Sequence, residues 1–169
     1  MIPPTTQLLS NIKIRPIQSS DNPELAKIIR NTLSEFGAAN PGTVFFDPTT
    51  DALFELFKMD KSAYFVAEAD GKILGGGGIF PTEGLPKGTC ELVKMYLLPE
   101  ARGIGLGRTL IEKSLETARK MGFRQVYLET LDELHLALKI YAKFGFKYLK
   151  APMGQTKHFG CGLWMLKKL

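Results

Sequence analysis

The chain has few of the residues that build disulfide frameworks or metal centres. Its 169 residues include two cysteines, Cys90 and Cys161, and two histidines, scattered without the spacing of a zinc site. Two separated cysteines give no disulfide framework and suit a reducing compartment. The sequence therefore predicts a cytoplasmic protein without a structural metal.

Long apolar runs are also missing. No window reaches the roughly 18 apolar residues that a membrane-spanning helix needs. The first ten residues, MIPPTTQLLS, carry two prolines where a secretion signal would be apolar. We therefore expect no membrane partner. The length and a hydrophobic fraction of 44% suit a single globular domain over residues 1–169.

The charge excess is basic but dispersed. The chain has 22 Lys+Arg against 17 Asp+Glu, a net charge of +5. A basic surface can serve a nucleic acid, an anionic membrane or an anionic small molecule. The sequence lacks the interleaved aromatic and basic residues of an RNA-binding motif, so we expect no nucleic-acid partner.

Apolar periodicity predicts an α/β fold with a mixed sheet. A period of two predicts a strand at residues 11–17, and a hairpin signal at Asp70-Gly71 predicts strands at 62–69 and 72–80. Runs bounded by turns and helices predict further strands at 90–98, 125–130, 146–149 and 161–166. Helical spacing predicts helices at 22–36, 52–57, 110–120 and 133–144, the second capped by Asp51. A strand–helix–strand crossover over residues 90–130 implies one parallel strand pair. We expect a mostly antiparallel sheet with helices on both faces.

Two segments have alternative interpretations. Four glycines in a row, residues 75–78, are unusual in a strand. They indicate close approach of a substrate, a bulge beside the site, or a simple packing requirement. Val44, Phe45 and Phe46 lie in a predicted loop and either pack on the core or line a pocket.

The stretch LPEARGIGLGRTLI, residues 98–111, stands between a predicted strand and a long predicted helix. Its glycines alternate with apolar residues, so the backbone can turn tightly where the helix begins. Free amides of the first helical turn, the helix dipole and two arginines favour a phosphate or pyrophosphate. The predicted anion cradle comprises Arg102, Gly103, Ile104, Gly105, Leu106, Gly107 and Arg108.

Spacing separates the possible nucleotide-binding loops. A Walker loop would need a lysine that this stretch lacks. A dinucleotide fingerprint would need a third glycine where Arg108 stands, and a shorter approach from the strand, although Glu129 lies at the right distance for the acidic residue. A nicotinamide-dependent oxidoreductase is therefore the weaker alternative.

The pattern R-x-x-G-x-G at residues 102–107, preceded by ELVKMYLLPEA, resembles the GNAT superfamily of N-acetyltransferases. A second segment, IYAKFGF at 140–146, is similar to the family's Leu-Tyr-x-x-x-Gly-Phe segment. The chain has Leu134 where many members carry asparagine. The resemblance implies a GNAT-like fold with a splayed parallel strand pair, acetyl-coenzyme A as co-substrate, and a loop that wraps its pyrophosphate. It also implies that main-chain amides of Met95, Tyr96 and Leu97 hold the thioester carbonyl and the pantetheine arm.

The same resemblance implies direct acetyl transfer to a primary amine of a small molecule or peptide. Glu91 stands where some members keep a general base, and Tyr141 where the family's tyrosine approaches the sulfur as general acid. Alternatively, Glu91 is a strand carboxylate paired with a lysine, and Tyr141 is a core residue. A nucleophilic Cys161 assisted by His158 is less favoured.

Other functions stay open at this level. A module that binds acetyl-coenzyme A as a sensor without turnover needs only the cradle. The acceptor is not readable from the sequence, because it depends on the loops at 38–50, 75–82 and 151–160. The chain is expected to be a monomer or a homodimer.

Overall fold

The computed structural model describes residues 11–154 and 160–169, and these form a seven-stranded mixed sheet of order β1-β2-β3-β4-β5-β7-β6. The strands are β1 (Ile12–Pro16), β2 (Ala63–Ala69), β3 (Lys72–Phe80), β4 (Thr89–Leu97), β5 (Gln125–Thr130), β6 (Lys147–Tyr148) and β7 (Leu163–Lys168). Only β4 and β5 run parallel among the described strands. The predicted mostly antiparallel sheet with one parallel pair is confirmed.

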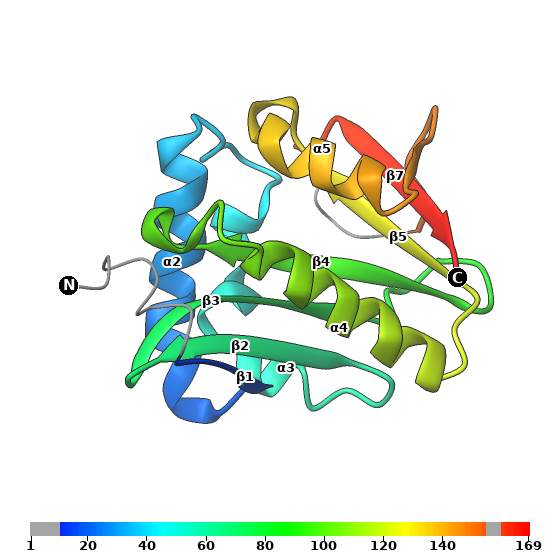
Figure 1. Ribbon diagram of the computed structural model, residues 1–169. Helices are drawn as coiled ribbons and strands as arrows, with labels where there is room; N and C mark the ends of the chain where they lie inside the picture. The colour runs from blue at the N-terminus through cyan, green and yellow to red at the C-terminus, as the bar shows by residue number, and fades with distance from the viewer. Residues whose placement is uncertain (1–10, 155–159) are drawn as a thin grey trace.

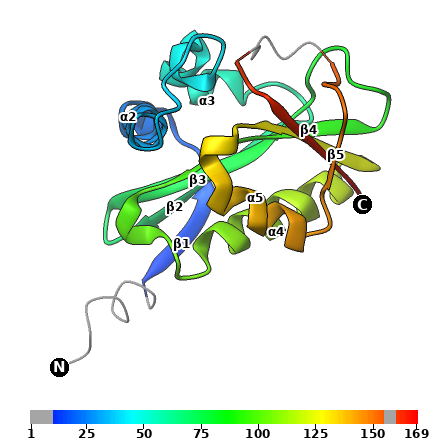
Figure 2. The ribbon, with the colours of Figure 1, turned by 90° about the horizontal axis from the view of Figure 1, so that it is seen from above.

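Helices cover both faces of this sheet, as predicted. They are α2 (Asn22–Glu35), α3 (Leu53–Leu56), α4 (Leu106–Lys120) and α5 (His135–Lys143). Short 3₁₀ turns join them: η1 (Ser19–Asp21), η2 (Val44–Phe46), η3 (Pro48–Asp51), η4 (Pro99–Ala101) and η5 (Asp132–Leu134). Helices α2 and α3 lie on one face, and α4 and α5 on the other (Figures 1 and 2).

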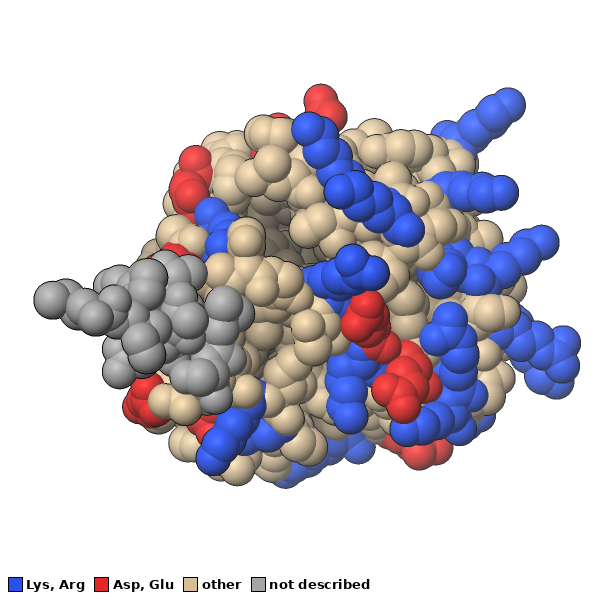
Figure 3. Space-filling view, in the orientation of Figure 1, with Lys and Arg blue, Asp and Glu red and all other residues tan. Residues whose placement is uncertain are grey.

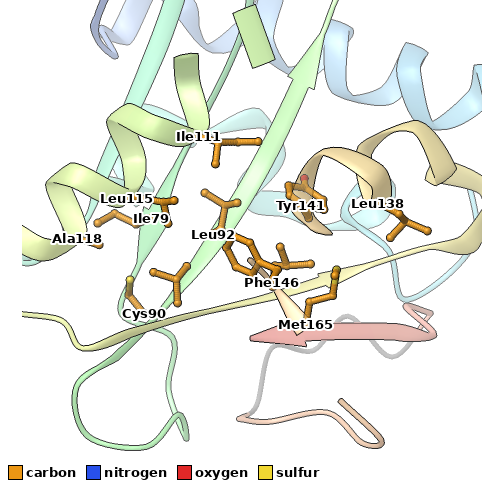
Figure 4. Packing of buried hydrophobic residues seen from close by; sticks show 12 residues of the cluster. Ile79, Cys90, Leu92, Ile111, Leu115, Ala118, Leu138, Tyr141, Phe146 and Met165 are labelled. Atoms are coloured by element: carbon orange, nitrogen blue, oxygen red, sulfur yellow. The ribbon is translucent and has the colours of Figure 1, made fainter. Parts of the chain in front are cut away.

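The main core lies between the sheet and the pair α4 and α5. The apolar stripe of α4, including Ile111 and Leu115, packs against Ile79 of β3 and Leu92 of β4. Figure 4 shows that Tyr141 of α5 and Phe146 join the same cluster. The helical period therefore fixes which face of α4 is buried and where its N-terminus points.

Three predictions of local structure need correction. Asp51 does not cap α3, whose N-cap is Ala52; its carboxylate binds Arg30 of α2 instead. The Asp51 carboxylate therefore binds the distant guanidinium of Arg30 and not the first main-chain amides of α3. The last strand starts at Leu163 rather than Cys161. The predicted 133–144 helix divides into η5 and α5.

Some predictions concern residues that lie outside the described part of the chain. These are the first ten residues, expected not to form a secretion signal, and His158. Among the described residues, no helix is long and apolar enough to cross a membrane. The described side chains also contain no cluster of three or more His, Cys, Asp or Glu able to hold a metal ion.

Candidate active site

The parallel strands β4 and β5 pair only along their first three residues. The register joins Thr89–Glu91 to Gln125–Tyr127 and then stops. Beyond Glu91 a cavity of about 660 Å³ opens between the strands, α2, α5 and the N-terminal end of α4. Figure 3 shows the surface hollowed on this face, with basic side chains standing around the hollow.

A bulge in β4 accompanies this separation. Gly78 pairs with Val93 and Gly76 with Tyr96, so β4 has one more residue than β3 between these pairs. Lys94 takes the extra position with φ of +52°, in the left-handed region that lysine rarely adopts. A bulge bends the strand, so the part of β4 beyond Lys94 turns away from the line of the ladder.

The glycines of β3 make room for the tyrosine that supports this bulge. The Tyr64 hydroxyl of β2 donates a 2.7 Å hydrogen bond to the main-chain carbonyl of Lys94. A Cβ on Gly76 would lie 2.6 Å from Cε1 of Tyr64, and one on Gly77 would overlap the Met95 side chain. Of the interpretations offered for residues 75–78, the structure supports the bulge and the packing requirement.

The glycine cradle has the geometry predicted for it. Gly103 and Gly105 have φ of +73° and +83°, and a Cβ at either would meet nothing within 4 Å, so this backbone is uncovered. The amide of Thr109 makes the bond that closes the first turn of α4, to Gly105, which leaves the preceding amides without helical acceptors. Ile104 and Leu106 pack on the core, while the other five cradle residues line the cavity.

Both arginines of the cradle line the cavity but have carboxylate partners. Arg102 makes two 2.9 Å hydrogen bonds to Glu35 of α2 and holds the pKa of that carboxyl below its usual value. Arg108 is exposed and pairs with Glu112. Lys143 of α5 lines the same cavity, a contribution that the sequence analysis missed. Direct contact of Arg102 and Arg108 with a phosphate stays a prediction.

Glu91 lines the cavity where the two strands separate. Its side chain is buried, and the Thr82 hydroxyl donates a 2.7 Å hydrogen bond to it. Glu129 of β5 lines the same cavity. From the sequence, Glu129 was a candidate only for a dinucleotide site, because its place in the same cavity as Glu91 depends on the pairing of β4 with β5.

Tyr141 lies on α5 with its ring against Phe146, at a centroid distance of 5.9 Å. The residue is 8% exposed and lines the cavity. Burial raises the pKa of its phenol to about 12. Met95, Tyr96 and Leu97 line the cavity too, so the structure brings the predicted acid, base and β4 residues to one space.

Lys94 and Cys161 also line the cavity. From the sequence, Lys94 had no predicted role and Cys161 had only a disfavoured one. Lys94 is almost completely buried, and burial lowers the pKa of its ammonium. Cys161 was weighed only as a disfavoured nucleophile; burial, with the nearby carboxylates Glu129 and Glu91, raises its pKa to about 12. In the sequence, the position of Lys94 within the apolar segment LVKMYLL was the one sign that this lysine would be buried.

Val44, Phe45 and Phe46 were expected either to pack on the core or to line a pocket, and the structure places them in different environments. Val44 lines the cavity, Phe45 packs on the core beside α2, and Phe46 is exposed. The loop between α2 and α3 therefore forms part of the cavity wall opposite α5.

Comparison with known proteins agrees with this geometry. The model of the acetyltransferase (GNAT) family matches residues 28–146. The chain belongs to the GNAT family. It is 40% identical over 157 residues to the uncharacterized N-acetyltransferase YjgM of Escherichia coli, covering 92% of this chain and 94% of YjgM.

Solved GNAT structures share the fold at low sequence identity. An acetyltransferase of the GNAT family from Staphylococcus aureus superposes with a TM-score of 0.82 at 20% identity, covering 93% of this chain and 98% of the other. The yncA protein of Salmonella typhimurium, solved with its cofactor acetyl-CoA, gives 0.71 at 21% identity and 94% coverage of both chains. The resemblance drawn from the glycine-rich loop and the IYAKFGF segment is confirmed.

In this GNAT domain, Tyr64→Phe tests the support of the bulge. We expect the free energy of unfolding to fall by about 1–3 kcal/mol, because the substitution leaves a buried carbonyl without its hydroxyl donor. Urea denaturation measures the change, and Tyr148→Phe is the control because Tyr148 is exposed. Equal stability of the two variants would contradict the role assigned to Tyr64.

Proposed function

We propose that this chain transfers the acetyl group of acetyl-coenzyme A directly to a primary amine of a small molecule or peptide. The observation that carries the proposal is that glycines and arginines of the cradle line the same cavity as Glu91 and Tyr141. Membership of the GNAT family gives the reaction class.

The residues of the cavity fit acetyl-coenzyme A. The uncovered backbone at Gly103 and Gly105, with the basic side chains of Arg102, Arg108 and Lys143 that line the cavity, suits a diphosphate. Apolar residues of α4 and α5, Ile111, Ala137 and Ile140, suit the pantetheine arm. Met95, Tyr96 and Leu97 lie on the part of β4 that lacks β5 as a partner. The Leu97 carbonyl accepts hydrogen bonds from the Arg102 side chain, so we expect the main-chain amides of this segment to bind the thioester carbonyl and the pantetheine arm.

Glu91 is the general base of the proposed reaction. An alkyl ammonium has a pKa of roughly 10 and must lose a proton before it can attack a carbonyl. The Glu91 carboxylate accepts that proton, directly or through one water. The hydrogen bond from Thr82 fixes one carboxylate oxygen and leaves its orientation defined.

Tyr141 is the general acid that protonates the departing sulfur. Acetyl-coenzyme A supplies an acyl carbon and a thiolate leaving group. A thiol has an ordinary pKa of about 8.5 and a phenol one of about 10, so the two groups are close enough in pKa for the phenol to protonate the departing thiolate.

The raised pKa of Cys161 also favours direct transfer over an acetyl-cysteine intermediate. A thiol with a pKa of about 12 is almost fully protonated at neutral pH. The thiolate is the nucleophilic form, so Cys161 is a poor acceptor of the acetyl group.

Assays of coenzyme A thiol release with a panel of amines test this proposal. We expect Tyr141→Phe and Glu91→Gln each to lower kcat by roughly 100- to 10,000-fold, because each removes one proton transfer. Tyr148→Phe, on an exposed tyrosine, is the control. Binding of acetyl-coenzyme A without thiol release from any amine would instead favour the sensor.

The pH dependence of kcat gives an independent prediction. The acid acts in its protonated form, and a pKa raised to about 12 keeps Tyr141 protonated well above neutrality. We therefore expect kcat to hold up to a pH of about 10, where an ordinary phenol would be half ionised. A fall in kcat below a pH of about 10 that disappears in Tyr141→Phe would contradict this assignment.

A further inference from the structure

The buried ammonium of Lys94 is the feature that the proposed mechanism does not use. Its side chain is 4% exposed and lines the same cavity as Glu91. Within the described part of the chain, Nζ has no hydrogen-bond partner. An ammonium carries three donors, and buried donors in proteins are almost always satisfied.

The carboxylate nearest to Lys94 gives it only partial compensation. Oδ2 of Asp47 lies 3.5 Å from Nζ, a distance that makes an ion pair but not a hydrogen bond. The other oxygen of Asp47 accepts two hydrogen bonds from Thr49, which fix the carboxylate to its own turn. The Arg30 guanidinium acts on Lys94 as a second positive charge.

The position of Lys94 on β4 is set by the bulge. Lys94 follows Glu91 by three residues on the same strand, at the bulge. Both side chains reach the cavity, and the Glu91 carboxylate acts electrostatically on the Lys94 ammonium. A small molecule lying between them would meet a carboxylate at one end and an ammonium at the other.

We propose that Lys94 binds a carboxylate of the acetyl acceptor, so that the acceptor is a free amino acid or a similar molecule with an amine and a carboxylate close together. This inference rests on the proposed function, since the amine of the acceptor is the group placed beside Glu91. The carboxylate supplies the missing acceptor for the Nζ donors. A polyamine would add positive charge beside Lys94, and a peptide N-terminus would offer only a neutral carbonyl.

The apolar lining of the cavity favours an apolar side chain on that acceptor. Leu33 of α2 and Val44, three residues before the Asp47 that pairs with Lys94, line it. Leucine is therefore a suitable first probe. Leucinamide keeps the amine and the side chain without the carboxylate, and 4-methylpentanoate keeps the carboxylate without the amine.

Calorimetry on the protein saturated with coenzyme A measures the three affinities without need of turnover. We expect leucine to bind roughly 10- to 100-fold more tightly than leucinamide, the range of a hydrogen bond to a charged group. 4-Methylpentanoate should compete with leucine. The remaining amino acids, each beside its amide, extend the comparison.

Lys94→Met should bring the ratio of leucine to leucinamide affinity close to one. Because this variant leaves Asp47 without its ion-pair partner, Lys94→Met/Asp47→Asn removes both charges together and keeps an oxygen for Thr49. Thermal unfolding shows that each variant is folded. The same ratio in the wild type and in the folded variants would overturn the assignment of Lys94.

Failure of this inference is distinguishable from failure of the proposed function. Thiol release from amines or peptides with no preference for a carboxylate would overturn the role of Lys94 and leave the transferase intact. Carboxylate-dependent binding lost in Lys94→Met, without thiol release from any amine, would support the Lys94 site and overturn the transferase. Absence of binding by every amino acid in the panel would overturn the Lys94 site.

Discussion

The hydrogen bond from the Tyr64 hydroxyl to the carbonyl of Lys94 supports the irregularity on which the cavity depends. Before the bulge, β4 is an ordinary central strand with β3 on one side and β5 on the other. After it, only β3 remains paired, and the other edge of β4 borders an open space. A strand edge inside a protein must find partners for its polar main chain. At Gly76 and Gly77 of β3, the side chains of Tyr64 and Met95 occupy the volume that a larger residue would need.

Groups of both charges line the cavity. The arginines and the uncovered backbone around the start of α4 suit an anionic nucleotide. The carboxylates of Glu91 and Glu129 and the buried ammonium of Lys94 line the same cavity. The buried phenol of Tyr141 and thiol of Cys161 are held in their protonated forms by burial. Basic groups, carboxylates and buried protonated groups share one cavity because the elements that supply them come from distant parts of the sequence.

Local signals in the sequence were sufficient for much of this arrangement. Periodicity predicted the sheet, and the spacing of the glycines predicted the backbone of residues 102–108. Contacts between distant segments were not predictable. Asp51 was expected to cap α3 but binds Arg30, and Arg102 of the cradle binds Glu35, 67 residues earlier. The convergence of Glu129 and Lys94 on the cavity depends on strand pairing and on the bulge, which periodicity does not specify.

Hydrogen exchange measured with and without coenzyme A shows whether the cofactor binds along the cradle and the unpaired edge of β4. We expect slower exchange at the amides of residues 103–108, where the cradle would hold the diphosphate, and at residues 92–97, where β4 has lost β5 as a partner. Exchange in β1, on the far edge of the sheet, should not change. Unchanged exchange at both segments under saturating coenzyme A, or protection confined to other strands, would contradict the account.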